Sequence, residues 1–260
     1  MPAWPERDGR HLLVTSAQMA ALEEQLFASG LPVEALMEKA ALAVSRRLLE
    51  QHGERLARDG ALVLVGPGHN GGDGLVIARE LHLAGISTAI WSPFERHKTL
   101  TAAHLRHACW LGIPALDHPP DPGDPAVWID ALFGIGQSRP PDKDLETLLE
   151  QRQQQQPGRL IAIDGPTGLC ADSGQPLGRV AACAALSLSI GLLKQGFLQY
   201  LPVGSLIGAA VLIELVLVLG TWTVAPAAMG TPGSPAPADV SNTVALGRIL
   251  YTKHVYFFQS

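Results

Sequence analysis

Short apolar runs alternate with helical patterns through most of this 260-residue chain, and this alternation limits its fold more than any other feature. The apolar runs that we interpret as strands are 61–65, 86–91, 127–132, 160–164, and two more near 184–190 and 209–218. Helical patterns lie between them, running to about residue 83, over 99–111 and over 145–155. Strands that alternate with helices form right-handed βαβ units and a parallel sheet covered on both faces. The sequence therefore predicts a three-layer, Rossmann-like α/β fold with a mostly parallel central sheet.

The two ends of the chain differ from this middle part. Thr15 and Gln18 have the spacing of a capping box and predict a helix over 16–29, and Gly30-Leu31-Pro32 separates it from a second helix. After residue 225 the chain is rich in Pro, Gly, Ala and Ser and cannot form a core, and its last residues, VYFFQS, resemble a tag remnant. We therefore assign residues 1–225 to one domain and 226–260 to a tail that is disordered or tag-derived.

Composition excludes several classes of partner. A net charge of −5 provides no basic surface for nucleic acid or an anionic membrane. The three cysteines form no CxxC pair, which favours a reducing compartment, and the N-terminus lacks an apolar stretch of signal-peptide length. The most apolar segment, 206–220, contains Glu214 and is shorter than the ~20 residues that span a bilayer. We expect a cytoplasmic protein with neither a nucleic-acid nor a membrane partner.

A glycine-rich segment, GPGHNGGDG (66–74), follows the strand predicted at 61–65 and opens a helix. Glycines let the backbone approach a ligand closely, and the first amides of a helix favour phosphate. A turn without a ligand would not need Asn70 and Asp73. A dinucleotide-binding dehydrogenase would also need an acidic residue at the end of the next strand, but that strand ends at Trp91-Ser92. The sequence thus favours a phosphorylated ligand over an ordinary NAD-dependent oxidoreductase.

Two carboxylates, Asp130 and Asp164, each lie at the carboxyl end of a predicted strand. Ligands of open parallel sheets bind beyond those ends, so both acids should face the same crevice as segment 66–74. Each Asp could instead cap the turn after its strand. The polar, Gly-containing segments 133–140 and 165–169 that follow favour a binding site.

Three motifs in this order, GPGHNGGDG, IDALFGIGQSRP (129–140) and IAIDGPTGL (161–169), resemble those of the NAD(P)H-hydrate epimerases, the YjeF N-terminal domain family. Residues 15–44 are similar to the two leading helices of that family, and SIGLLKQGF (189–197) is similar to its late Lys-Gly element. The resemblance covers roughly residues 12–220. It implies an isomerase of metabolite repair that interconverts the R and S epimers of NADH or NADPH hydrated at C6.

The resemblance also implies a set of site residues. One K+ per subunit would be held by Asn70, Asp130 and Thr167, oxygen donors that suit a hard cation. Asp164 would contact the reacting nicotinamide end of the substrate. The substrate-binding residues would be His69, Asn70, Gly71, Gly72, Asp73, Gly134, Ile135, Gly136, Gln137, Ser138, Arg139, Pro140 and Asp164.

Four positions depart from the family pattern. His69 and Lys39 stand where the family has Asn, Thr167 stands where it has Ser, and Gly165 loosens the Asp-Ile-Pro-Ser-Gly turn. Thr167 keeps the hydroxyl that would bind the cation. These departures leave a non-catalytic nucleotide-binding or protein-interaction module of the same fold as the alternative function.

Epimerisation at C6 requires the C–O bond to break and to re-form on the other face. We hypothesise that Asp164 is the catalytic residue that protonates the departing hydroxyl and deprotonates the incoming water, with Lys194 or His69 as candidates to share that work. The resemblance also implies a functionally coupled ADP- or ATP-dependent dehydratase, and it allows a homodimer. The roughly 35 residues after the core are too few for a dehydratase domain, so we expect this chain to catalyse epimerisation alone.

Overall fold

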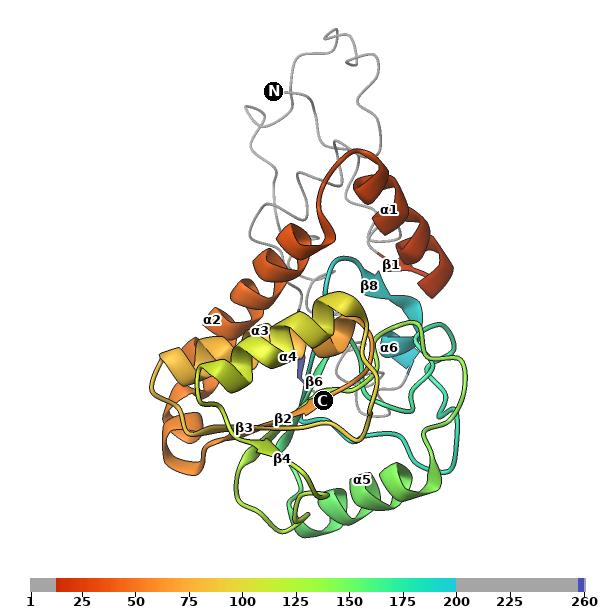
Figure 1. Ribbon diagram of the computed structural model, residues 1–260. Coiled ribbons are helices and arrows are strands. Elements are labelled where there is room, and N and C mark those ends of the chain that lie inside the picture. The colour runs from red at the N-terminus through yellow and green to blue at the C-terminus, as the bar shows by residue number, and fades with distance from the viewer. Residues whose placement is uncertain (1–12, 200–256, 260) are drawn as a thin grey trace, which may run out of the picture.

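The computed structural model describes residues 13–199 and 257–259 and is built around one central sheet (Figure 1). Six parallel strands have the order β4-β3-β2-β5-β6-β7, which is the doubly wound order 3-2-1-4-5-6. The strands are β2 (Ala61–Val65), β3 (Thr88–Trp91), β4 (Ala115–Leu116), β5 (Val127–Ala131), β6 (Leu160–Ile163) and β7 (Leu186–Leu188). A seventh strand, β9 (Phe257–Gln259), pairs antiparallel with β7 at the edge.

Helices cover both faces of this sheet. One face packs against α2 (Val33–Asp59), α3 (His69–Leu83) and α4 (Thr99–Trp110), and the other against α5 (Lys143–Gln155), as Figure 1 shows. Alternate residues of each strand supply the two cores: Val63 and Ile129 belong to the first, Leu64 and Trp128 to the second. The predicted three-layer, mostly parallel fold is therefore confirmed.

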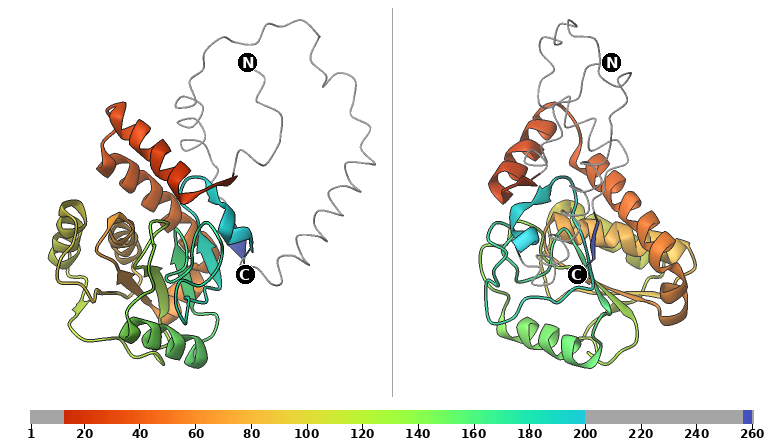
Figure 2. Two further views of the ribbon diagram at one scale, coloured as in Figure 1. Left: turned by 90° about the vertical axis from the view of Figure 1, so that its right-hand side faces the viewer. Right: turned by 180° about the vertical axis from the view of Figure 1, so that it is seen from behind.

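The N-terminal helix α1 (Ser16–Ala28) lies beside the carboxyl ends of the strands rather than on a face of the sheet (Figures 1 and 2). The predicted capping box is present, with Thr15 bonded to the backbone of Gln18 and Gln18 bonded back. The short strand β1 (Leu13–Val14) pairs in parallel with β8 (Leu193–Lys194), which leads into α6 (Gln195–Gln199). A small cluster that includes Met19, Leu26 and Leu192 holds α1 in place.

The predicted helices are present, and the bounds of α1, α4 and α5 move by two residues at most, whereas α2 continues to Asp59, well past Leu48, the last residue of its predicted pattern. Strand β3 starts at Thr88 rather than at residue 86, and β5 ends at Ala131. The strands β1, β4 and β8 were not predicted because two residues are too short for a periodic pattern. The strand predicted near 209–218 lies outside the described residues, and so does most of the tail. The exception is β9, which pairs with the central sheet although the sequence analysis places the tail outside the domain.

Candidate functional site

A cavity of about 1010 Å³ opens where the strand order reverses, between the carboxyl ends of β2 and β5. This switch point is where open α/β sheets bind ligands. Its walls come from the glycine-rich segment after β2, the loop after β5, the residue after β6, and α1. The predicted site residues that line it are His69, Asn70, Asp73, Gly134, Ile135, Gly136, Gln137, Ser138, Arg139, Pro140 and Asp164.

The glycines of the 66–74 segment let the first turn of α3 lie directly on its neighbours. A Cβ on Gly66 would lie 1.5 Å from the carbonyl oxygen of Leu132, and one on Gly71 would lie 2.0 Å from that of Gly66. Gly72 packs on Met37 in the same way. Gly71 and Gly72 are buried and do not line the cavity, so they shape the site from beneath, and their predicted contact with substrate stays a prediction.

Asp164 lies directly after β6 in the left-handed region, with φ 55°, which an aspartate adopts only when its surroundings hold it there. Its Oδ1 accepts a hydrogen bond from Nζ of Lys194 at 2.6 Å and another from the backbone N–H of Ile190 at 3.1 Å. Lys194 is fully buried, and its remaining bonds go to Oγ of Ser189 and the carbonyl of Ile190. The ion pair therefore fixes the position of the Asp164 carboxyl group, which lines the cavity.

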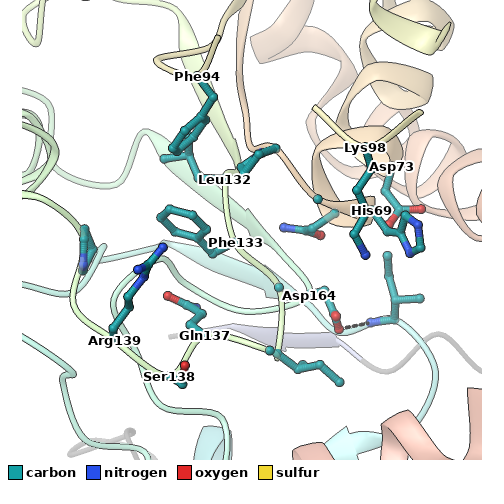
Figure 3. A pocket seen from close by; sticks show the side chains of 18 of the residues that line it. His69, Asp73, Phe94, Lys98, Leu132, Phe133, Gln137, Ser138, Arg139 and Asp164 are labelled. Atoms are coloured by element: carbon teal, nitrogen blue, oxygen red, sulfur yellow. Dashed lines mark hydrogen bonds between the residues drawn. The ribbon is translucent and has the colours of Figure 1, made fainter. Parts of the chain in front are cut away.

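Two more carboxyl groups share this end of the cavity. Asp73 extends from α3, and Glu23 extends from α1. Burial raises the pKa of Asp73 well above its usual range, and the negative charges of Asp164 and Glu23 raise it further. Burial also raises the pKa of Glu23, with a second contribution from Asp164 and an opposing one from Lys194. Three acids and one buried ammonium thus lie at the Asp164 end of the cavity. Figure 3 labels two of the acids, Asp73 and Asp164.

Asp130 and Thr167 form a fully buried pair that does not line the cavity, so the expectation that Asp130 faces it together with Asp164 is wrong for Asp130. Both oxygens of Asp130 are used: Oδ2 accepts from the Thr167 N–H at 2.9 Å, and Oδ1 accepts from the Thr167 hydroxyl at 2.7 Å and the Leu132 N–H at 3.2 Å. Burial raises the pKa of Asp130, and these hydrogen bonds oppose that rise. Asn70 donates from Nδ2 to the carbonyl of Ile163 at 3.1 Å, next to Asp164. Its buried Oδ1 has no hydrogen-bond partner among the described residues.

The loop after β5 forms the far wall of the cavity, where Ser138 and Arg139 lie in Figure 3. The side chain of Gln137 fastens this loop to the turn after β6: its Nε2 donates to the carbonyl of Pro166 at 3.0 Å, and its Oε1 accepts from the N–H of Gly168 at 2.6 Å. The Gln137 amide is therefore occupied by the protein itself, and its contribution to the cavity is to hold the loop in place.

Two basic residues lie where α3 begins. His69 starts the helix, and Lys98 is the residue that precedes α4. Burial lowers the pKa of His69, and the nearby charge of Lys98 lowers it further. Both residues line the cavity, at its side opposite Arg139 (Figure 3).

Reasoning from the sequence missed Glu23 and Lys98. The strand-end rule predicts which residues follow parallel strands, but Glu23 comes from a helix outside the sheet and Lys98 precedes a helix. Glu23 lies within TSAQMAALEEQLFASG, a segment whose helical pattern and similarity to the leading helices of the family assign no role to this carboxylate. Lys194 had been named as a candidate helper, and the structure places its ammonium against Asp164.

A doubly wound sheet with a cavity at its switch point places the chain in the class of Rossmann-like α/β proteins. Residues 33–196 match the family described as YjeF-related protein N-terminus, and the chain belongs to that family. It is 41% identical over 186 residues to the bifunctional NAD(P)H-hydrate repair enzyme Nnr of Thermosynechococcus vestitus, a match that covers 72% of this chain and 36% of the relative. It is 35% identical to the NAD(P)H-hydrate epimerase of Limosilactobacillus fermentum, covering 70% of this chain and 87% of that protein.

A solved structure agrees with these matches. The crystal structure of the yeast protein YNL200c superposes with a TM-score of 0.61 at 26% identity, covering 69% of this chain and 80% of that one. The chain spans little more than a third of the length of the bifunctional relatives that it matches. No helix in residues 13–199 is both long and apolar enough to cross a membrane.

Proposed function

We propose that this chain is an NAD(P)H-hydrate epimerase that interconverts the R and S epimers of C6-hydrated NADH and NADPH in metabolite repair. Its near full-length similarity to an enzyme of that name supports the proposal. The observation that carries it in this chain is the Asp164–Lys194 pair, which lines a dinucleotide-sized cavity beside the glycine-rich start of α3.

The cavity offers distinct surroundings to the two ends of a dinucleotide. The first amides of α3, with His69 and Lys98 beside them, suit a phosphate group. Arg139 on the opposite wall is a second cation that could meet a phosphate or ribose. The acidic end, around Asp164, suits the ring that becomes positively charged during the reaction. We therefore place the nicotinamide at Asp164 and the phosphates towards the start of α3.

We propose one K+ held by Asn70, Asp130 and Thr167. The donors fit a hard cation because they are amide, carboxylate and hydroxyl oxygens. The buried Oδ1 of Asn70 lacks a partner among the described residues, and a cation would satisfy it. When bound, K+ would supply positive charge that holds the turns after β5 and β6 in register.

Asp164 is the residue that we propose to act at C6. The sequence hypothesis assigned it both proton transfers. Its ion pair with Lys194 fixes the Asp164 carboxyl group in the cavity, where it is placed to take a proton from incoming water. We further propose that the product passes to an ADP- or ATP-dependent dehydratase in the cytoplasm, which agrees with the bifunctional nature of the longer relatives.

A coupled assay tests this function. An S-specific NAD(P)H-hydrate dehydratase is given purified R hydrate, with and without this protein. If the protein is an epimerase, the dehydratase consumes all of the R hydrate, and the rate is proportional to the concentration of this protein. Consumption no faster than spontaneous epimerisation would remove the proposed activity.

The Asp164→Asn variant tests the assigned residue. Loss of the carboxylate should slow epimer exchange about 10²–10⁴-fold, the usual contribution of a positioned acid or base. The matched control is Asp117→Asn, which removes the same group from a side chain that is 97% exposed. An Asp164→Asn rate within threefold of the wild-type rate would remove Asp164 from catalysis.

A further inference from the structure

Asp73 carries a carboxyl group that the protein leaves without a partner. Within the described residues, no donor lies within hydrogen-bonding distance of it, although the residue is mostly buried. The adjacent glycines lower this part of α3 onto its surroundings: a Cβ on Gly72 would lie 2.7 Å from the Met37 side chain, and one on Gly74 would lie 2.5 Å from Cβ of Ala131. The backbone that carries Asp73 is therefore packed closely against its neighbours, and the Asp73 carboxyl faces the cavity (Figure 3).

Charge balance at this end of the cavity distinguishes the three acids. The neighbouring charges that raise the pKa of Asp73 are those of Glu23 on α1 and Asp164 after β6. His69 and Lys98 line the same cavity where α3 begins. The one buried ammonium, that of Lys194, bonds directly to Asp164. Asp164 therefore has a cationic hydrogen-bond donor, while Asp73 has none and lies in a desolvated position near two other acids. Two carboxyl groups in such different surroundings are the arrangement from which acid and base roles can be assigned.

We propose that Asp73 is the general acid that protonates the departing C6 hydroxyl and that Asp164 is the base of the second half-reaction, an assignment that rests on the proposed epimerase function. In the first step the C6–O bonding pair goes to oxygen while the Asp73 proton joins it, so that water leaves and the ring nitrogen stabilises the cation at C6. Water then forms a new C6–O bond on the opposite face and gives its proton to Asp164. Both carboxyl groups return to their starting state by exchange with solvent in the open cavity.

The other candidates fit the acid role less well. Lys194 has three hydrogen-bond acceptors and no exposed surface, so its protons are directed to the protein. His69 lies beside Lys98, and burial and that charge both favour its neutral form. Glu23 is a neighbouring acid, but its helix is held by a small cluster at the edge of the fold, whereas α3 is anchored in the main core. Lys194 is accordingly a positioning residue for Asp164.

The test compares Asp73→Asn with wild type in the coupled assay between pH 5 and 9. We expect a loss of about 10²–10⁴-fold at pH 7. Wild-type kcat/KM should fall at alkaline pH as Asp73 loses its proton. The kcat/KM of the variant should not show this alkaline fall from a constant value. It should instead rise steadily towards acid pH, because hydronium ion then has to supply the proton. Asp73→Glu should recover part of the rate, and the control Asp117→Asn should match wild type throughout.

Binding separates a chemical role from a structural one. NADP affinity of Asp73→Asn, measured by calorimetry, should stay within threefold of wild type. Asp73→Ser is the second variant, because its smaller side chain fits the same space without the carboxyl. The proposal is overturned if either variant keeps a rate within threefold of wild type, or if the slowed variants keep the wild-type pH profile. If wild type itself fails to accelerate epimer exchange, the proposed function fails instead.

Discussion

The ends of the parallel strands form an amino-terminal edge and a carboxyl edge of the central sheet, and the buried polar groups at these two edges differ. At the amino-terminal edge Arg152 is almost fully buried, lies 4.4 Å over the ring of Trp128, and donates to the carbonyls of Pro122, Asp124, Ala126 and Arg159. Arg159 in turn bonds to Asp59 at the end of α2. At this edge Nε of Arg152 and Nε1 of Trp128 have no hydrogen-bond partner among the described residues, but the terminal nitrogens of Arg152 bind four carbonyls and hold them together, so the edge serves stability.

At the carboxyl edge the protein leaves polar groups incomplete. Asp73 has no partner among the described residues, and neither has the buried Oδ1 of Asn70. Unsatisfied polar groups lower stability, and the two at the carboxyl edge differ from those at the amino-terminal edge because Asn70 and Asp73 line the cavity, where a ligand can satisfy them or a reaction can use them. The comparison separates the part of the sheet that maintains the fold from the part that performs chemistry, and each prediction below tests that separation.

The largest expected effect is at the amino-terminal edge. Arg152→Met keeps an apolar stem over Trp128 but leaves carbonyl groups around it without their donor. We expect the free energy of unfolding to fall by about 3 kcal/mol or more, since each unsatisfied buried acceptor is costly. Urea unfolding measures this. Arg106→Met, at an exposed position on α4, should change stability by less than about 0.5 kcal/mol.

The same variant should leave chemistry intact. Epimer exchange per folded molecule should stay within twofold of wild type, because no part of Arg152 lines the cavity. A large loss of kcat/KM in folded protein would show that the two edges are coupled, and it would contradict the separation of stability from chemistry.

A second prediction distinguishes two glycines of one motif. Gly66→Ala places a methyl group against the Leu132 carbonyl, and Gly68→Ala places one where no atom lies within 4 Å. We expect Gly66→Ala to lower the free energy of unfolding by about 1–3 kcal/mol, the usual cost of overpacking, and to slow epimer exchange as the loop shifts. Gly68→Ala should be nearly neutral in unfolding experiments. Equal effects of the two substitutions would contradict the close approach.

Sequence reasoning was most successful where a rule connects position in the chain to position in space. The run of five apolar residues at 61–65 is β2 to the residue, and the strand-end rule brought Asp164 and the loop after β5 to the cavity. The rule gave no information about side-chain partners. That Lys194 neutralises Asp164 depends on the β1–β8 pair, whose two-residue strands have no periodic signal.

Glu23 was out of reach for a related reason. A carboxylate on an amphipathic helix is usually solvated, and nothing within its segment distinguishes Glu23 from Glu24. Its place in the cavity follows from the way in which α1 packs through Met19 and Leu26, a tertiary contact that no local pattern contains.

A third prediction concerns the proposed K+ at the carboxyl edge. If Asn70, Asp130 and Thr167 hold the cation, K+ at ten times its Kd should stabilise the folded state by about 1.4 kcal/mol. Thermal unfolding in KCl and in tetramethylammonium chloride at equal ionic strength measures the difference. Asp130→Asn should lose the K+ response, and Asp117→Asn should keep it. An identical response to both salts in wild type would argue against the ion.

The smallest effect should come from Asp73, and its sign is diagnostic. Because burial and two neighbouring acids raise its pKa in the folded state, protonated Asp73 favours folding at acid pH, and that contribution is lost as pH rises through the raised pKa. Asn does not titrate. Asp73→Asn should therefore be more stable than wild type at pH 8.5, by about 0.5–2 kcal/mol as for other stabilising substitutions, with a smaller gap at pH 5. A gap that is equal at both pH values, measured by urea unfolding, would mean that Asp73 is solvated like an ordinary surface acid. Asp73 would then not be the protonated acid that the proposed reaction needs, and the difference between the carboxyl edge and the amino-terminal edge would depend on Asn70 alone.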